Sequence, residues 1–264
     1  MEFYKIDLKN THNTRSLSYL KNKDGLNIKD NLLIRSDALS KIDAEDINSL
    51  VTKYNLKKII DLRTENEVYN NPDKKIPGVK YIHNSVLPNE IIGITKKEDL
   101  KDDFHDFVEK LKKEGIDSSI DYMINVYKNL VEIDYANEAY GKFLNELLNF
   151  PGGATLWHCS AGKDRAGFAT FLVLYVLDFE LDVIFEDYLA TNTFYETHVE
   201  NVSSNYSSEY KEIIWSIFGV QKEYITTVFQ VIKSKYGNLE EYLEKALKFD
   251  KIKKEKLKKI YLGE

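Results

Sequence analysis

One segment combines a strand, a loop and a helix in close succession. Residues 154–158 are a short apolar run, and residues 165–177 are almost entirely apolar or small. Between them lies a loop of small and charged residues that opens with Cys159. A short apolar run bounded by a loop is typical of a buried strand, and a helix without a polar face is typical of a helix buried on all sides. The segment therefore requires a fold in which a buried strand leads directly into a buried helix.

Three further apolar runs, at residues 31–35, 58–63 and 79–86, predict strands. Between the first two, the apolar positions of residues 47–54 show helical spacing, and Asp43 stands where an N-cap is expected. Strands that alternate with helices favour parallel pairing. The sequence therefore predicts an α/β fold with a mainly parallel central sheet flanked by helices.

The remainder of the chain is predicted to be largely helical. Apolar residues recur at helical spacing over residues 104–111, 120–131, 140–147, 225–236 and 239–247. Gly237 is expected to end the fourth of these helices, and Asn238 to cap the start of the fifth. The Asn- and Ser-rich residues 191–208 predict a mobile loop or lid. With no internal repeat and no clear boundary, residues 1–264 are expected to form a single domain. It would carry a helical insertion at about 88–150, and a lid and C-terminal helices at about 180–264.

Composition excludes several classes of protein. The net charge of -6 argues against a general nucleic-acid partner. A single cysteine excludes an internal disulfide and a cysteine-rich zinc site. No metal and no cofactor are expected. Neither a signal peptide nor a membrane span is visible, which favours a cytoplasmic location without excluding secretion by a route that needs no signal.

The loop that opens with Cys159 has the chemistry of a phosphate site. Backbone N–H groups at the start of a helix attract an anion, and Gly162 permits backbone angles that other residues resist. Arg165 can bind two phosphate oxygens at once. A field that holds phosphate also stabilises the thiolate of Cys159, which would attack phosphorus to form a cysteinyl-phosphate that water hydrolyses. The alternative is that Cys159 is a buried small hydrophobe, but its spacing from Arg165 favours a site.

The segment His158-Cys-Ser-Ala-Gly-Lys-Asp-Arg165 resembles the Cys-x5-Arg loop of the cysteine-dependent protein tyrosine phosphatases. Its Gly-Lys-Asp-Arg form resembles a bacterial branch of that family, which includes a mycobacterial tyrosine phosphatase. Further segments are similar to that branch in the same order: 13–17, 35–39, 61–67, 187–192 and 236–243. The resemblance implies a cysteine-phosphatase-like fold and hydrolysis of phosphotyrosine in proteins or peptides.

Cys159 is then the nucleophile and Arg165 the phosphate clamp. The substrate-binding residues would be the loop itself, through the backbone amides of residues 160–165, together with flanking side chains. This predicted set comprises His158, Ser160, Ala161, Gly162, Lys163 and Arg63. His158 would orient the thiolate, or it is a buried structural histidine.

A general acid must protonate the leaving oxygen of tyrosine. The resemblance implies an acid at Asp164, inside the loop. Asp61 is the alternative, because neighbouring strand ends converge on one rim of a parallel sheet. Asp61 and Arg63 could instead form an ion pair that braces a strand end. No Trp-Pro-Asp motif, which supplies the acid in other tyrosine phosphatases, occurs in the sequence.

Three features bear on substrates and turnover. By resemblance, Lys163 would extend the activity to phosphoinositides, and phosphoserine or phosphothreonine esters are further expected substrates; a solvent-facing lysine is the alternative. Ala166 stands where the family usually has Thr or Ser, so slower breakdown of the phosphoenzyme is expected. The lysine-rich residues 250–264 could contact a membrane surface, although the solvated face of a terminal helix is favoured.

Two rival functions are compatible with a cysteine in an anion-binding loop. A rhodanese-like sulfurtransferase also carries a cysteine at the head of an anion-binding loop. A phosphate-binding module without turnover would bind phosphate through the same loop amides and Arg165.

Overall fold

The computed structural model describes residues 4–89 and 119–263. Its main sheet has β6 at the centre, and β6 pairs in parallel with β3 on one side and with β4 on the other. β5 extends the parallel sheet beyond β4, and β1 pairs antiparallel with β3. The strand order is β1 (Arg15–Ser16), β3 (Leu33–Ser36), β6 (Ala154–His158), β4 (Leu56–Asp61) and β5 (Lys80–His83). The predicted mainly parallel sheet is confirmed.

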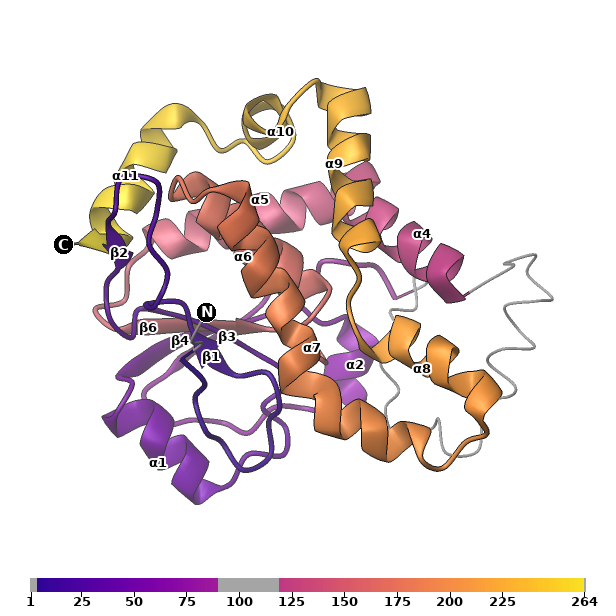
Figure 1. Ribbon diagram of the computed structural model, residues 1–264. Helices are drawn as coiled ribbons and strands as arrows, with labels where there is room; N and C mark the ends of the chain where they lie inside the picture. Colours follow the sequence, from indigo (N-terminus) through magenta and orange to yellow (C-terminus); the bar gives the residue numbers. More distant parts are fainter. Residues whose placement is uncertain (1–3, 90–118, 264) are drawn as a thin grey trace.

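Helices cover both faces of this sheet, and the face opposite α1 carries far more of them (Figure 1). The first helices are α1 (Ala44–Thr52), α2 (Glu65–Asn70), α4 (Ser119–Glu132), α5 (Asp134–Leu148) and α6 (Arg165–Val176). They are followed by α7 (Leu181–Ser203), α8 (Lys211–Phe218), α9 (Lys222–Tyr236), α10 (Leu239–Lys245) and α11 (Lys251–Tyr261). A short 3-10 turn, Ser208–Tyr210, precedes α8. A separate antiparallel pair of β2 (Asn27–Ile28) and β7 (Leu262–Gly263) joins the N-terminal region to the end of the chain.

Alternation along β6 divides the interior into two apolar clusters. Leu156 lies in the cluster that contains Leu50 of α1. Trp157 lies in the larger cluster with α5 and α6, and its ring meets Phe143 edge-on at 5.4 Å. Successive strand residues point to opposite faces, so a strand that is apolar throughout must be covered on both. The buried strand and the buried helix are both confirmed, since every residue of α6 except Tyr175 is buried.

Local capping signals define several helix ends as predicted. Asp43 caps α1 by accepting hydrogen bonds from the amides of Glu45 and Asp46. Gly237 ends α9 with a φ of 90°, a backbone conformation that favours glycine. Asn238 then caps α10 through the amide of Glu241.

The expectation of a loop across residues 191–208 is wrong for most of that range. Helix α7 continues to Ser203, and its buried side chains include Thr191, Tyr195 and Val199, which recur every four residues. Tyr195 and Val199 pack with Ile214 and Ile217 of α8 in a third apolar cluster. Packing against α8 stabilises a helix whose Asn and Ser residues point to a loop by composition alone. The helix predicted at 104–111 lies outside the described residues.

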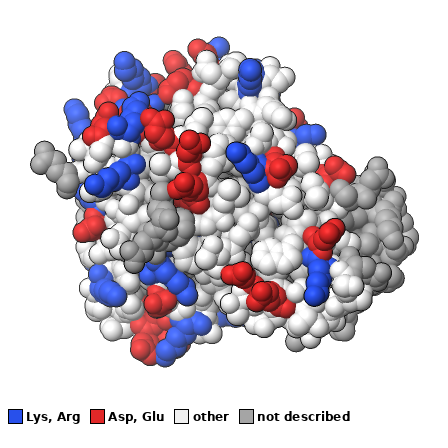
Figure 2. Space-filling model, in the orientation of Figure 1, with Lys and Arg blue, Asp and Glu red and all other residues white. Residues whose placement is uncertain are grey.

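Lysines of the C-terminal helix are paired with acidic side chains. Lys254 contacts Asp178 and Glu240, and Lys258 contacts Asp178 and Glu255. Blue and red side chains are interspersed around the upper left of the face in Figure 2, the region that α11 occupies in Figure 1. Over the described residues, no helix combines the length and apolarity that crossing a lipid bilayer requires.

Candidate active site

The loop between β6 and α6 leaves the central strand of the sheet, flanked by the ends of β3 and β4. Cys159 is its first residue and is 2% exposed, and Arg165 opens α6. Sheet topology thus brings the nucleophile candidate to the carboxyl edge of three parallel strands. In open α/β sheets this edge is where ligands bind.

Only glycine fits at position 162, for two reasons. Its φ is +68°, in the left-handed region. A Cβ built there would lie 2.5 Å from the backbone oxygen of Ser36, at the end of β3. The loop therefore bends tightly while its backbone presses against the neighbouring strand.

Four successive loop carbonyls accept hydrogen bonds from groups outside the loop. The imidazole Nδ1 of His158 lies 3.0 Å from the Cys159 oxygen, and the amide of Ala38 lies 3.2 Å from the Ser160 oxygen. The Ala161 oxygen accepts from Tyr195 at 2.8 Å and from Asn13 at 3.2 Å. The Gly162 oxygen accepts from Asn13 at 3.0 Å and from Arg35 at 2.6 Å.

These outward carbonyls determine where the loop amides point. Across a planar trans peptide, the C=O of one residue and the N–H of the next point in opposite directions, and the described chain has no cis peptide. The amides of residues 160–163 therefore face away from the surrounding protein groups, toward the concave side of the loop. Amides that converge in this way form an anion-binding nest.

A buried ion-pair network holds the outer side of the loop. Asp187 of α7 accepts from Arg15 at 3.1 Å and from Arg35 at 2.6 Å, and Arg35 continues to the loop. Burial would raise the pKa of Asp187, but the two guanidinium groups lower it to about 2. Asp187 is therefore a permanent carboxylate that fixes both arginines.

Arg165 is paired with Glu67 of α2. Its two terminal nitrogens contact the two carboxylate oxygens at 2.5 and 2.8 Å, and Ser160 donates to the same carboxylate at 2.6 Å. Burial would lower the pKa of Arg165, yet Glu67 above all, and then Cys159 and Asp164, raise it. The guanidinium is charged and held in a defined plane beside the loop.

Asp164 immediately precedes Arg165 and is partly exposed, at 16% of its side chain. Its Oδ1 accepts a hydrogen bond from the Tyr127 hydroxyl at 2.7 Å. Lys163, by contrast, is buried, and its ammonium donates to the backbone oxygens of Ile217 at 2.6 Å and Gly219 at 3.1 Å. Lys163 thus binds carbonyls at the end of α8, which differs from the solvent-facing alternative.

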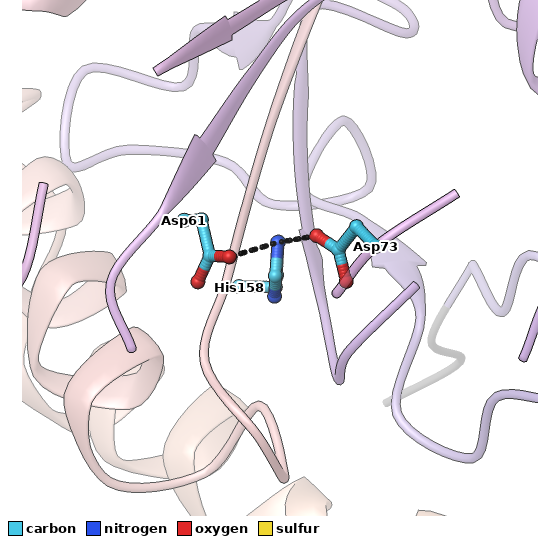
Figure 3. Close-up of side chains that lie close together, drawn as sticks. All are labelled: Asp61, Asp73 and His158. Carbon is cyan, nitrogen blue, oxygen red and sulfur yellow. Dashed lines mark ion pairs between the residues drawn. The ribbon is translucent and has the colours of Figure 1, made fainter. Parts of the chain in front are cut away.

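His158 lies between two carboxylates, Asp61 and Asp73 (Figure 3). Its Nε2 is 2.8 Å from Asp73 and 3.8 Å from Asp61. Burial would lower the pKa of His158, but Asp73 and Asp61 raise it to about 9. At neutral pH the ring is therefore an imidazolium that forms an ion pair with Asp73 through Nε2 and donates a hydrogen bond from Nδ1 to the Cys159 carbonyl.

Asp61 is fully buried and bound to Arg63, whose guanidinium also contacts Asp73 at 2.9 Å. Tyr81 donates to Asp61 at 2.6 Å. Burial would raise the pKa of Asp61, but His158 and Arg63 hold it well below its ordinary range. Asp61 and Arg63 thus form the ion pair that was the alternative reading of the strand end.

Asp61, Asp73 and His158 place potential metal-ligand atoms within 4.8 Å of one another. A metal ion requires a neutral imidazole nitrogen. Here the ring is charged, and the carboxylates already face Arg63 and the imidazolium. The cluster has the chemistry of an ion-pair network rather than that of a metal site.

Several residues that contact the loop are not among those that the sequence predicts for the site. Glu67, Asp73, Tyr127 and Tyr195 contact the loop or its flanking histidine, from distant parts of the chain. One local signal was available: Thr64 and Glu67 have capping-box spacing, which predicts a helix start beside Asp61. Nothing local predicts the contact between that glutamate and Arg165.

The α/β sheet and its strand–loop–helix unit define a phosphatase-type architecture with a phosphate-binding loop. The pattern of the tyrosine phosphatase family matches residues 6–263, and the chain belongs to that family. It is 26% identical over 239 residues to the triple specificity protein phosphatase PtpB of Mycobacterium tuberculosis, covering 81% of this chain and 85% of the relative. It is also 26% identical to a protein of Cupriavidus necator named provisionally as a tyrosine-protein phosphatase, covering 90% of this chain and 82% of that one. The protein is therefore a phosphatase that acts on phosphotyrosine.

Proposed function

We propose that the protein hydrolyses phosphotyrosine through a cysteinyl-phosphate formed on Cys159. The observation that carries this proposal is the anchoring of four consecutive loop carbonyls to groups outside the loop, which turns the following amides toward the concave side of the loop. The phosphate oxygens would bind these amides and the guanidinium of Arg165. A bound phosphorus would then lie within reach of the sulfur, and preorganised donors stabilise the charge that develops on the transferring group.

In the first step the thiolate of Cys159 attacks phosphorus, the S–P bond forms, and the bond to the tyrosine oxygen breaks. The leaving oxygen takes a proton from the Asp164 carboxyl. In the second step water attacks phosphorus and gives a proton to the Asp164 carboxylate, while the S–P bond breaks and the thiolate is restored. The net reaction consumes one water and releases tyrosine and inorganic phosphate.

We assign the acid to Asp164 rather than to Asp61. An acid must hold a proton before it donates one, and the ion pair with Arg63 keeps Asp61 ionised. Asp164 belongs to the loop itself and is partly exposed. Asp61 and Arg63 then serve to brace the end of β4, and His158 orients the Cys159 carbonyl.

We further propose phosphoserine, phosphothreonine and phosphoinositide esters as secondary substrates. The loop amides and Arg165 would bind the phosphate group itself, whatever alcohol it is esterified to. The relative PtpB is named for triple specificity. Lys163 would reach an acidic head group only by giving up its bonds to Ile217 and Gly219. A Lys163→Ala variant that lost as much phosphopeptide as phosphoinositide hydrolysis would contradict a lipid role for this lysine.

We infer that residues 6–263 form one phosphatase domain. The residues that anchor the loop are spread from Asn13 near the start of that range to Gly219 in its helical half. A cut between two independent units would separate the loop from some of its anchors.

Release of phosphate from 4-nitrophenyl phosphate tests the proposal. The wild-type protein should turn over, and Cys159→Ser should be inactive while retaining the circular dichroism spectrum and thermal transition of the wild type. Turnover that survives in Cys159→Ser refutes the covalent mechanism. A folded wild-type protein that binds phosphate without turnover would support a binding module, and thiocyanate formation from thiosulfate and cyanide would support a sulfurtransferase.

A further inference from the structure

A pair of buried tyrosines contacts the aspartate of the loop. The hydroxyl oxygen of Tyr127, on α4, lies 2.7 Å from Oδ1 of Asp164. The hydroxyl oxygen of Tyr188, on α7, lies 2.7 Å from that of Tyr127. Both tyrosines are almost completely inaccessible to solvent. Two helices from different parts of the chain therefore supply two hydrogen-bonded hydroxyl groups, and the one from α4 binds the carboxyl group of Asp164.

The direction of these hydrogen bonds follows from the chemistry of the groups. Burial raises the pKa of Tyr127 well above its ordinary value, and the Asp164 carboxylate raises it further. Tyr127 therefore keeps its proton and donates it in a hydrogen bond to Asp164. Because that proton is committed, the Tyr188 hydroxyl is the donor between the two tyrosines.

The two oxygens of Asp164 are not equivalent. The ammonium of Lys163 lies 3.3 Å from Oδ1, the same oxygen that accepts from Tyr127. One hydrogen-bond donor and one nearby ammonium at Oδ1 stabilise negative charge on that oxygen. A proton on the carboxyl group is therefore better placed on Oδ2, and Oδ2 is the oxygen that would deliver it.

We propose that Tyr127, supported by Tyr188, is a positioning residue for acid catalysis by Asp164. It fixes the rotation of the carboxyl group so that Oδ2 carries the transferable proton. It also stabilises the carboxylate that remains when the proton has passed to the leaving oxygen. This inference rests on the proposed role of Asp164 as the general acid.

The ring of Tyr127 is held independently of its hydroxyl. It lies 5.5 Å from the ring of Tyr224 and 6.3 Å, edge-on, from the ring of Tyr188. Tyr127→Phe keeps these ring contacts and removes the hydroxyl, with its hydrogen bonds to Asp164 and to Tyr188. Tyr224→Phe is a matched control, because Tyr224 belongs to the same aromatic group but donates to the backbone oxygen of Ser216 at 2.9 Å.

The test compares kcat/KM for two aryl phosphates that differ in leaving group. Phenol needs a proton from an acid as it departs, whereas 2,4-dinitrophenolate leaves unaided. Asp164→Asn should lower kcat/KM for phenyl phosphate by about 100-fold or more and leave 2,4-dinitrophenyl phosphate nearly unchanged. Tyr127→Phe should lower the phenyl phosphate value by about tenfold with the same selectivity, since a hydrogen bond to a charged group is lost. Tyr224→Phe should change neither value.

The outcomes distinguish a failure of the acid role of Asp164 from a failure of the positioning role of Tyr127. Equal losses on both substrates in Asp164→Asn would remove the acid role of Asp164 and the inference with it. Selective loss in Asp164→Asn without selective loss in Tyr127→Phe would overturn only the role of Tyr127. A selective loss in Tyr224→Phe as large as that in Tyr127→Phe would assign the effect to packing and overturn it as well. If Tyr127→Phe failed to fold, Tyr188→Phe provides the second test, with a smaller loss of the same selectivity expected, and an unselective result there refutes the inference.

Discussion

The imidazolium of His158 makes the stability of the fold depend on pH in the alkaline range. The ring is fully buried, and burial alone would lower its pKa. Asp73 and Asp61 outweigh burial and raise the pKa from 6.5 to about 9. Between these values the folded protein binds a proton that the unfolded chain releases. The stabilisation is therefore complete below about pH 6.5 and is lost as the pH rises through about 9.

The magnitude follows from the size of the pKa shift. A difference of about 2.5 pKa units, at 1.36 kcal/mol per unit, corresponds to about 3 kcal/mol of unfolding free energy. Domains of this kind are stable by roughly 5–15 kcal/mol in total. The loss should therefore be measurable as a clear shift of the denaturation midpoint.

Urea denaturation at pH 6, 7.5, 9 and 10 measures this dependence. The wild-type protein should lose about 3 kcal/mol across the series. Asp73→Asn, which removes the carboxylate that most strongly raises the pKa of His158, should show a much flatter profile. His12→Gln changes an exposed histidine of the N-terminal region and should retain the wild-type slope. A flat wild-type profile, or an unchanged slope in Asp73→Asn, would refute the reasoning.

Three further predictions concern the loop. Gly162→Ala should lower kcat/KM for 4-nitrophenyl phosphate by about 100-fold or more, because alanine is strained at the left-handed φ and its methyl group meets the Ser36 backbone. Steady-state kinetics measures this loss, and near-normal activity would contradict it. Glu67→Gln should raise KM for the same substrate by about tenfold, since Arg165 loses its charged partner, and an unchanged KM counts against that role. Prolonged peroxide treatment should cause a loss of activity that dithiothreitol does not reverse, because the chain has a single cysteine and no second thiol to trap the sulfenic acid. Full recovery of activity with dithiothreitol would contradict this prediction.

Much of the fold could be predicted because its signals are local. The apolar run at 154–158 became β6 without a change of boundary, and Asp43, Gly237 and Asn238 marked helix ends correctly. Each of these signals depends on neighbours within a few positions. The loop predicted across 191–208 is wrong because the buried, four-residue spacing of Tyr195 and Val199 stabilises a helix despite the Asn- and Ser-rich composition.

The partners of the site residues could not be predicted in the same way. Arg165 is held by Glu67, 98 positions earlier, and Asp164 by Tyr127, 37 positions earlier. Tyr127 has the spacing of an ordinary core residue on α4, and only the folded packing brings its hydroxyl to Asp164 and Tyr188. Such contacts depend on how helices pack against the sheet, which no short stretch of sequence encodes.

The anchors of the loop carbonyls also bear on the order of events during folding. Asn13, Arg35 and Tyr195 must all be in place before the Ala161 and Gly162 carbonyls are fixed, and these residues span most of the chain. Long-range closure of this kind comes late, because the entropy of bringing distant segments together must first be overcome. A growing or partly folded chain would thus carry Cys159 as an ordinary thiol, and its special reactivity would arise only when the last distant segment docks.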